Sequence, residues 1–66
     1  MKELSEFVKM RRKAVDLTQE EFADRAGVAL TVIRKIEQNK TNLNLDKVNQ
    51  VLKMFGHKLC PLALKI

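Results

Sequence analysis

The segment from Thr18 to Gly27 constrains the fold of this 66-residue chain more than any other. Thr18 is a good helix N-cap, and Glu21 follows three residues later, which is the spacing of a capping box. Leu17 and Phe22 flank this cap as a hydrophobic staple, and Gly27 supplies the positive φ at which a helix stops. The sequence therefore predicts a short helix of about two turns between two fixed ends.

Three further helices are predicted from apolar spacing, over residues 3–15, 30–38 and 45–55. Only two glycines and one proline punctuate the chain, which favours helices. Asn39 is the expected left-handed stop after the second of these helices, Asn44 caps the third, and Gly56 ends it. The first of these helices has Leu4, Phe7, Val8 and Val15 at helical spacing, and Met10 and Ala14 are also at helical spacing. The inward residues of the next are Ile33 and Ile36, with Val32 or Ala29 beside them, and the apolar stripe of the last is Leu45, Val48, Val51, Leu52 and Phe55.

The last ten residues, HKLCPLALKI, have the period-two pattern of a strand. The four apolar positions that alternate are Cys60, Leu62, Leu64 and Ile66. Pro61 has no N–H for a central ladder, so the strand must be an edge or a bulged strand. A lone strand has no partner in an otherwise helical chain. We expect it to pair with the same strand of a second chain across a two-fold axis. The alternative is a tail that packs on the last helix.

Length and composition limit how such a chain can be stabilised. A domain of about 60 residues is marginal alone. Cys60 is the only cysteine, and together with His57 it provides too few ligands for a structural zinc. Oligomerisation remains, so we expect a dimer. No apolar run approaches a membrane span or a signal peptide, which predicts a soluble cytoplasmic protein. The net charge of +5 suggests an anionic partner.

The helix before Gly27 and the helix after it have the residue sizes of a tight helix-turn-helix. Ala23, four residues before Gly27, is small enough for two helices to cross steeply. Val28 follows the turn, and Ile33 and Ile36 anchor the second helix of the pair.

Two stretches carry a resemblance to known proteins. LTQEEFADRAGV followed by IRKIEQNK resembles the lambda-repressor and Cro type of helix-turn-helix, the Xre family, over about residues 8–55. LNLDKVNQVLKMFG and the terminal strand resemble HipB-type antitoxins, which are dimeric repressors of their own toxin–antitoxin operons and bind a HipA-like kinase toxin. The resemblance implies an all-α fold of four to five helices. Residues 1–56 would form the DNA-binding domain, and residues 57–66 would form a dimerisation strand.

The resemblance also implies site residues, with the third helix in the major groove. The expected base-reading residues are Ala29, Leu30, Thr31, Arg34 and Lys35. The expected phosphate-binding residues are Arg12, Thr18, Gln19, Asn39, Lys40 and Thr41. The expected dimerisation residues are Cys60, Leu62, Leu64 and Ile66. Arg12 matches a position that pairs with Glu37. Ala29 stands where the family commonly has a serine cap, so this helix begins with a weaker cap.

The function that these residues predict is sequence-specific repression. The protein would bind an inverted repeat in double-stranded DNA as a homodimer in a prokaryotic cytoplasm, associated with the nucleoid, as the HipB-like antitoxin of a toxin–antitoxin operon. The alternatives are a restriction–modification controller, a phage Cro-type repressor, or an antitoxin that acts mainly by binding protein. No nucleophile–base pair, glycine-rich phosphate loop or metal cluster is present, so we expect neither an enzyme nor a cofactor.

Overall fold

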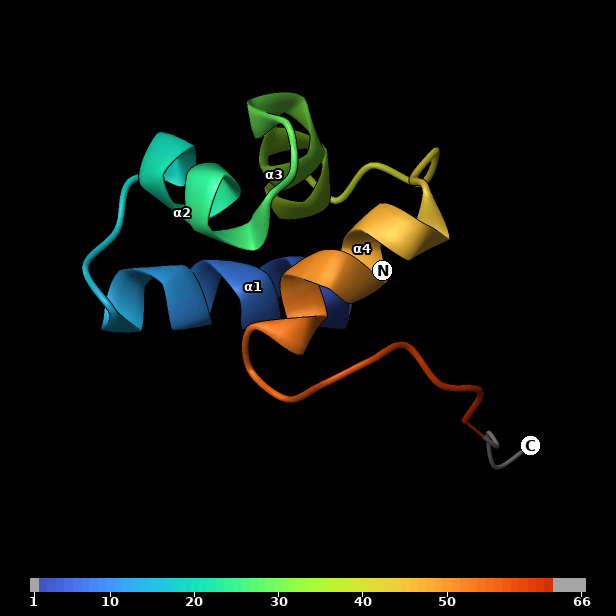
Figure 1. Cartoon of the computed structure of the whole chain (residues 1–66). Coiled ribbons are helices and arrows are strands. Elements are labelled where there is room, and N and C mark those ends of the chain that lie inside the picture. The colour runs from blue at the N-terminus through green and yellow to red at the C-terminus, as the bar shows by residue number, and fades with distance from the viewer. Residues whose placement is uncertain (1, 63–66) are drawn as a thin grey trace.

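The computed structural model describes residues 2–62, and these form four helices (Figure 1). Helix α1 spans Lys2–Ala14, α2 spans Gln19–Ala26, α3 spans Leu30–Glu37 and α4 spans Leu45–Lys53. The expected all-helical core is therefore confirmed for this part of the chain, and it contains four helices rather than five. None of these helices is both long enough and apolar enough to cross a membrane.

The ends of α2 are formed by local contacts, as the sequence predicts. The Thr18 hydroxyl accepts a hydrogen bond from the Glu21 amide at 3.1 Å, and the Glu21 carboxylate accepts one from the Thr18 amide at 2.9 Å. These two bonds complete the capping box. The hydrogen bond from the Thr18 amide also lowers the pKa of Glu21. At the other end, Gly27 has φ +73°, a left-handed conformation that closes α2.

The ends of α3 and α4 lie about where the sequence predicts them, except at the last turn of α4. Asn39 has φ +59°, so it forms the expected left-handed stop. The Asn44 side chain accepts a hydrogen bond from the Lys47 amide at 3.2 Å, whereas Ala29 caps α3 without any side-chain bond. Helix α4 ends two residues earlier than predicted, because the amides of residues 54–56 bond to carbonyls three residues earlier and tighten the chain.

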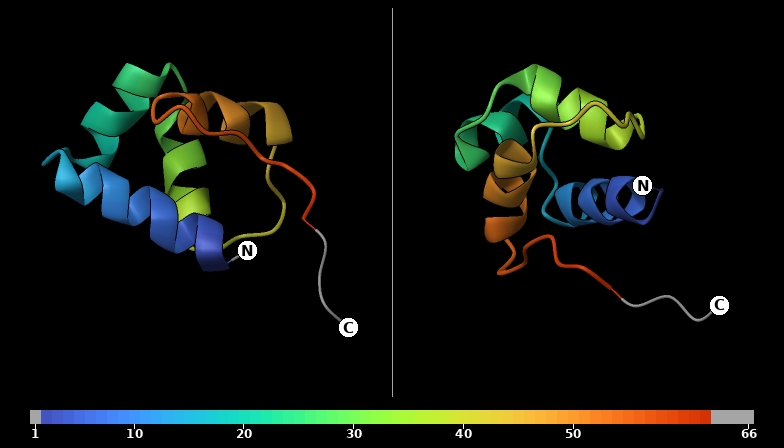
Figure 2. Two further views of the ribbon diagram at one scale, coloured as in Figure 1. Left: turned by 90° about the horizontal axis from the view of Figure 1, so that it is seen from below. Right: turned by 90° about the vertical axis from the view of Figure 1, so that its right-hand side faces the viewer.

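One apolar core lies between the helices, and α3 packs against α1, α2 and α4 (Figure 2). Phe22, Ile33 and Val8 are completely buried within it. The full set of buried apolar residues is Val8, Phe22, Ala23, Ala26, Ile33, Ile36, Val48, Val51 and Leu52. Phe55 extends this core, because its ring stacks on that of Phe22 with the centroids 5.6 Å apart.

Four of the apolar residues that the sequence places at helical spacing are exposed. Met10 and Ala14 lie about 160° and 120° around α1 from the buried Val8, at 3.6 residues per turn, so their helical spacing relates them to each other and not to the core. Val15 follows the last residue of α1, and Leu45 is the first residue of α4. The side chains of Val15 and Leu45 therefore lie beyond the parts of α1 and α4 that pack in the core.

The segment from His57 to Leu62 forms no strand within the chain that the structure describes. It leaves the end of α4 as an extended connection (Figure 1). The Leu59 amide donates to the Asn49 side chain at 2.7 Å, whereas Cys60 and Leu62 are exposed. Leu64 and Ile66 lie outside the described residues. Pairing across a dimer and the boundary between residues 56 and 57 therefore stay predictions.

Candidate nucleic-acid interface

The turn between α2 and α3 is held from both sides. The Val28 amide donates to the Ala23 carbonyl at 3.0 Å across the turn. From α4, the Gln50 amide nitrogen donates to the carbonyls of Ala26 and Gly27, both at 2.9 Å. The sequence predicts the small buried Ala23 but not the role of Gln50, because that role depends on where α4 packs. This clamp by Gln50 joins α4 to the turn between α2 and α3.

Helix α3 has one buried face and one exposed polar face. Ile33 and Ile36 anchor it in the core. Thr31, Arg34 and Lys35 are exposed on the other side. Of the remaining predicted base-reading residues, Ala29 is exposed, whereas Leu30 is half-buried against the core. The structure thus places four of the five on the surface.

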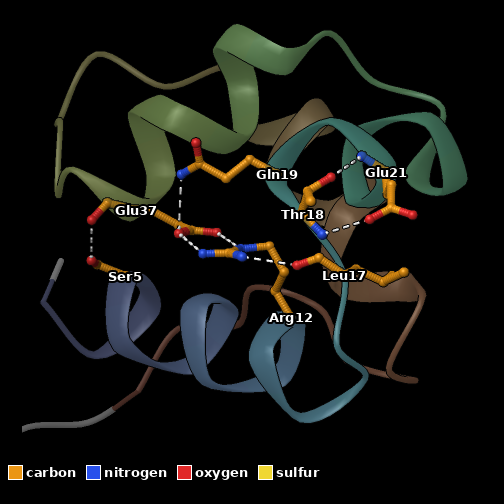
Figure 3. Close-up of polar contacts among 7 residues, drawn as sticks. All are labelled: Ser5, Arg12, Leu17, Thr18, Gln19, Glu21 and Glu37. Atoms are coloured by element: carbon orange, nitrogen blue, oxygen red, sulfur yellow. Dashed lines mark hydrogen bonds and ion pairs between the residues drawn. The ribbon is translucent and has the colours of Figure 1, made fainter.

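Glu37 connects the last turn of α3 to both preceding helices (Figure 3). Arg12 holds the Glu37 carboxylate with two hydrogen bonds, from Nε to Oε2 at 2.7 Å and from Nη2 to Oε1 at 3.0 Å. Gln19 donates to the same Oε1 at 3.2 Å, and the Ser5 hydroxyl donates to the Glu37 backbone carbonyl at 2.9 Å. A third donor of Arg12, Nη1, bonds to the Leu17 carbonyl at 2.9 Å. The predicted Arg12–Glu37 pair is therefore confirmed, as part of a larger network.

Burial and hydrogen bonding act in opposite directions on this network. Burial raises the pKa of Glu37, but the hydrogen bonds from Arg12 and Gln19 outweigh it and lower the pKa below its ordinary value. The hydrogen bond to Glu37 raises the pKa of Arg12 in turn. The side chains of Arg12 and Glu37 are only 14% and 3% exposed. Arg12 and Gln19, both predicted to bind phosphate, thus direct guanidinium and amide N–H donors toward Glu37.

The other predicted phosphate-binding residues lie at the surface. Asn39, Lys40 and Thr41 are exposed in the loop after α3. Thr18 is also exposed, but its hydroxyl oxygen accepts the cap bond of α2.

Lys47 is a surface cation that the sequence analysis did not connect with this site. With Thr31, Lys35 and Asn44 it lines a small hollow of about 150 Å³ between α3 and the first turn of α4. Two lysines therefore border the exposed part of α3. No local pattern could identify Lys47, because its position depends on the packing of α4 against α3.

Within residues 2–62, no three His, Cys, Asp or Glu side chains are placed to hold a metal ion.

Comparison with known proteins identifies the family. The profile of the Helix-turn-helix family matches residues 8–60, which is more than half of the chain and includes all of α2, α3 and α4. No curated protein and no solved structure matches the chain. The family is a DNA-binding regulatory one. The chain therefore belongs to the Xre and lambda-repressor-like helix-turn-helix family of DNA-binding regulators.

Proposed function

We propose that this protein is a transcriptional repressor that recognises its operator with α3 in the major groove. The observation that carries this proposal is the exposed polar face of α3, on a helix whose opposite face is fixed in the core. Arg34 and Lys35 can donate to guanine O6 and N7, and Thr31 can bond to several bases. Ala29 and the exposed part of Leu30 can contact a thymine methyl group.

Positive and polar groups beside this face would bind the DNA backbone. Lys40, with Asn39 and Thr41, follows α3 directly. Lys47 adds a cation next to Lys35. The amides at the start of α2, near Thr18 and Gln19, would face a phosphate on the other side, with Arg12 behind them. Such contacts position a protein on DNA without reading its sequence.

The operator would be an inverted repeat bound by a homodimer. Dimers of this class bind half-sites about 34–36 Å apart, which is one helical turn of DNA. The alternating apolar residues Cys60, Leu62, Leu64 and Ile66 would form the dimer contact. The small size of the chain supports this arrangement, because a second copy adds buried apolar surface.

The narrower proposal is a HipB-type antitoxin in a prokaryotic cytoplasm, bound to the nucleoid. It is supported by the resemblance of the stretch LNLDKVNQVLKMFG and the segment after it. The expected partner is a HipA-like kinase encoded next to this gene. Co-expression with that neighbouring product and purification through a tag on the kinase would test it. Absence of a complex at equal expression would contradict the antitoxin role and leave the repressor role standing.

The test of the repressor role is a DNA titration at two salt concentrations. The fragment upstream of this protein's own gene is compared with a scrambled fragment of equal length. We expect a preference for the native fragment of roughly a thousandfold or more, the lower end for specific binders. Equal and steeply salt-dependent binding to both fragments would mean that only phosphate attraction operates, and would contradict the proposal.

Four lysine and arginine variants test the division into base and backbone contacts. Arg34→Ala and Lys35→Ala should each cost about 1–3 kcal/mol on the native fragment and reduce the preference for it. Lys40→Ala should weaken binding to both fragments and lower the salt slope by about 1. Lys53→Ala is the matched control, because Lys53 is exposed at the far end of α4. If neither Arg34→Ala nor Lys35→Ala changed the preference, α3 would not be the reading helix.

A further inference from the structure

The two ends of α3 are held in different ways. At its last residue, Glu37 accepts hydrogen bonds from side chains of both α1 and α2. At its start, Ala29 makes no side-chain cap bond, so the first amides of the helix have no capping partner. The first turn of α3 carries Leu30 and Thr31. Its position therefore depends on the turn that precedes it.

Two backbone carbonyls of that turn, those of Ala26 and Gly27, are held by a side chain. Among residues 2–62, no backbone amide donates to either carbonyl. Carbonyls at the end of a helix stay unsatisfied unless a side chain, water or a tightened turn provides a donor. Here the Gln50 amide nitrogen on α4 donates to both, at 2.9 Å each. A side-chain amide has two N–H donors, and this clamp uses both.

We propose that Gln50 is a positioning residue that sets how well the first turn of α3 reads DNA. The inference rests on the proposed function and adds to it a residue that acts without a contact to DNA. Through the carbonyls of Ala26 and Gly27, the Gln50 amide orients the peptide groups that lead from α2 into α3. Only two residues separate Gly27 from Leu30, the first residue of α3. A change in those peptide groups therefore moves the start of the reading helix.

The turn needs an outside restraint because glycine does not restrict its own backbone. Gly27 has φ +73°, and glycine has access to more of φ/ψ space than any other residue. Rotation about its ψ angle would turn its carbonyl toward water and redirect the chain that enters α3. A Cβ on Gly27 would lie 3.0 Å from the Gln50 amide nitrogen, so this amide packs directly against the glycine. Gln50 thus supplies the restraint that the glycine lacks.

The two carbonyls determine which side chains can act at position 50. Both are acceptors, so the side chain must end in a group with at least two N–H donors. Gln50→Met removes the donors at a similar length, whereas Gln50→Lys keeps three donors and places a cation at the C-terminal end of α2, which favours it. The neighbouring Val51 is completely buried, so α4 keeps its place in the core when residue 50 changes.

A DNA titration with the native and scrambled fragments tests the proposal. We expect Gln50→Met to reduce the preference for the native fragment at least about fivefold, which is the smallest effect of losing one good base contact. Gln50→Lys should restore most of that preference. A fall in the folded fraction lowers binding to both fragments by the same factor. A loss of stability alone therefore leaves the preference unchanged.

Asn49→Leu is the matched control on the same helix. Asn49 is half-buried like Gln50, and its side chain also bonds to a distant backbone group, the Leu59 amide at 2.7 Å. That bond holds the segment after α4 and not the turn before α3. Asn49→Leu should therefore lose stability in urea unfolding but keep the fragment preference. Circular dichroism of each variant confirms that its helices are retained.

A double-mutant cycle places the effect at the start of α3. Thr31 lies in the first turn of α3, so Gln50→Met and Thr31→Ala together should change the preference by less than the product of their single effects. Lys40 follows the other end of α3, so Gln50→Met and Lys40→Ala should give that product.

Amide hydrogen exchange measures the turn in the absence of DNA. The Val28 amide donates across the turn, so its exchange reports on whether the turn is closed. Gln50→Met should speed exchange at Val28, whereas Asn49→Leu should not.

Three results would each overturn the inference: an unchanged fragment preference in Gln50→Met, an equal loss of preference in Asn49→Leu, and unchanged exchange at Val28 in Gln50→Met. The same measurements separate the inference from the proposed function. A wild type without any fragment preference contradicts the repressor role, and with it the reading role of Gln50. A wild type whose preference is retained by Gln50→Met contradicts the role of Gln50 alone.

Discussion

Replacing Glu37 by glutamine should cause a large loss of stability although it barely changes the shape of the side chain. The substitution removes the charge that faces Arg12 at 2.7 Å and 3.0 Å, and it brings an amide NH₂ group toward the guanidinium donors. Removing one partner of a buried ion pair costs about 3–5 kcal/mol, because the other charge stays buried without compensation. Arg12 keeps its bond to the Leu17 carbonyl and is 14% exposed, so we expect about 2–4 kcal/mol.

This loss is large relative to the total free energy of unfolding. A chain of this length has a free energy of unfolding of about 3–10 kcal/mol, at roughly 0.05–0.15 kcal/mol per residue. For a domain of this size each kcal/mol shifts the melting temperature by about 4–8 °C. Thermal and urea unfolding followed by circular dichroism should therefore show Glu37→Gln melting at least about 8 °C lower than the wild type.

An exposed ion pair provides the control. Lys2 and Glu6 are 3.8 Å apart on the surface of α1, so Glu6→Gln should change the free energy of unfolding by less than about 1 kcal/mol. A double variant, Arg12→Met with Glu37→Leu, should be more stable than the sum of its two single variants predicts, because no unpaired charge remains. If Glu37→Gln cost no more than Glu6→Gln, the account of Glu37 as the connection between three helices would be refuted.

Three further changes have outcomes that follow from single observations. The lowered pKa of Glu37 stabilises the folded state at pH values above the unfolded-state pKa of about 4.3, and this stability is lost as the pH falls through the folded-state pKa. The wild type should therefore lose stability below about pH 4. Glu37→Gln should show a smaller loss in acid unfolding curves. Gly27→Ala should cost about 1–2 kcal/mol of stability in urea unfolding, because φ is +73° and the new Cβ would meet the Gln50 amide nitrogen at 3.0 Å. No loss of stability would mean that the turn relaxes freely. Thr18→Ala should cost about 0.5–2 kcal/mol by removing the cap bond to Glu21, whereas Thr18→Ser should restore most of it.

The sequence by itself determined the four helices and most of their ends. The capping box at Thr18, the left-handed residues Gly27 and Asn39, and the cap at Asn44 all act within four residues along the chain. Contacts of this range depend only on neighbouring residues, so pattern and residue type suffice to predict them. The resemblance to the Xre and lambda-repressor type of helix-turn-helix, which depends on the same local spacings, was confirmed by the match over residues 8–60.

Only the tertiary structure decided which polar groups remain available for a ligand. Arg12 and Gln19 have the residue types of phosphate ligands, yet Glu37 holds both, from positions 25 and 18 residues away in sequence. The guanidinium of the half-buried Arg11 is likewise held by a distant element, because it lies over the rings of Phe7 and Phe55, at 5.7 Å and 5.2 Å.

The clamp at Gln50 and the position of Lys47 beside α3 depend on the same tertiary information. Each requires knowing where α4 crosses the earlier helices. Helical periodicity gives the face on which a residue lies, but the crossing angles that bring two faces together are set by how the whole core packs.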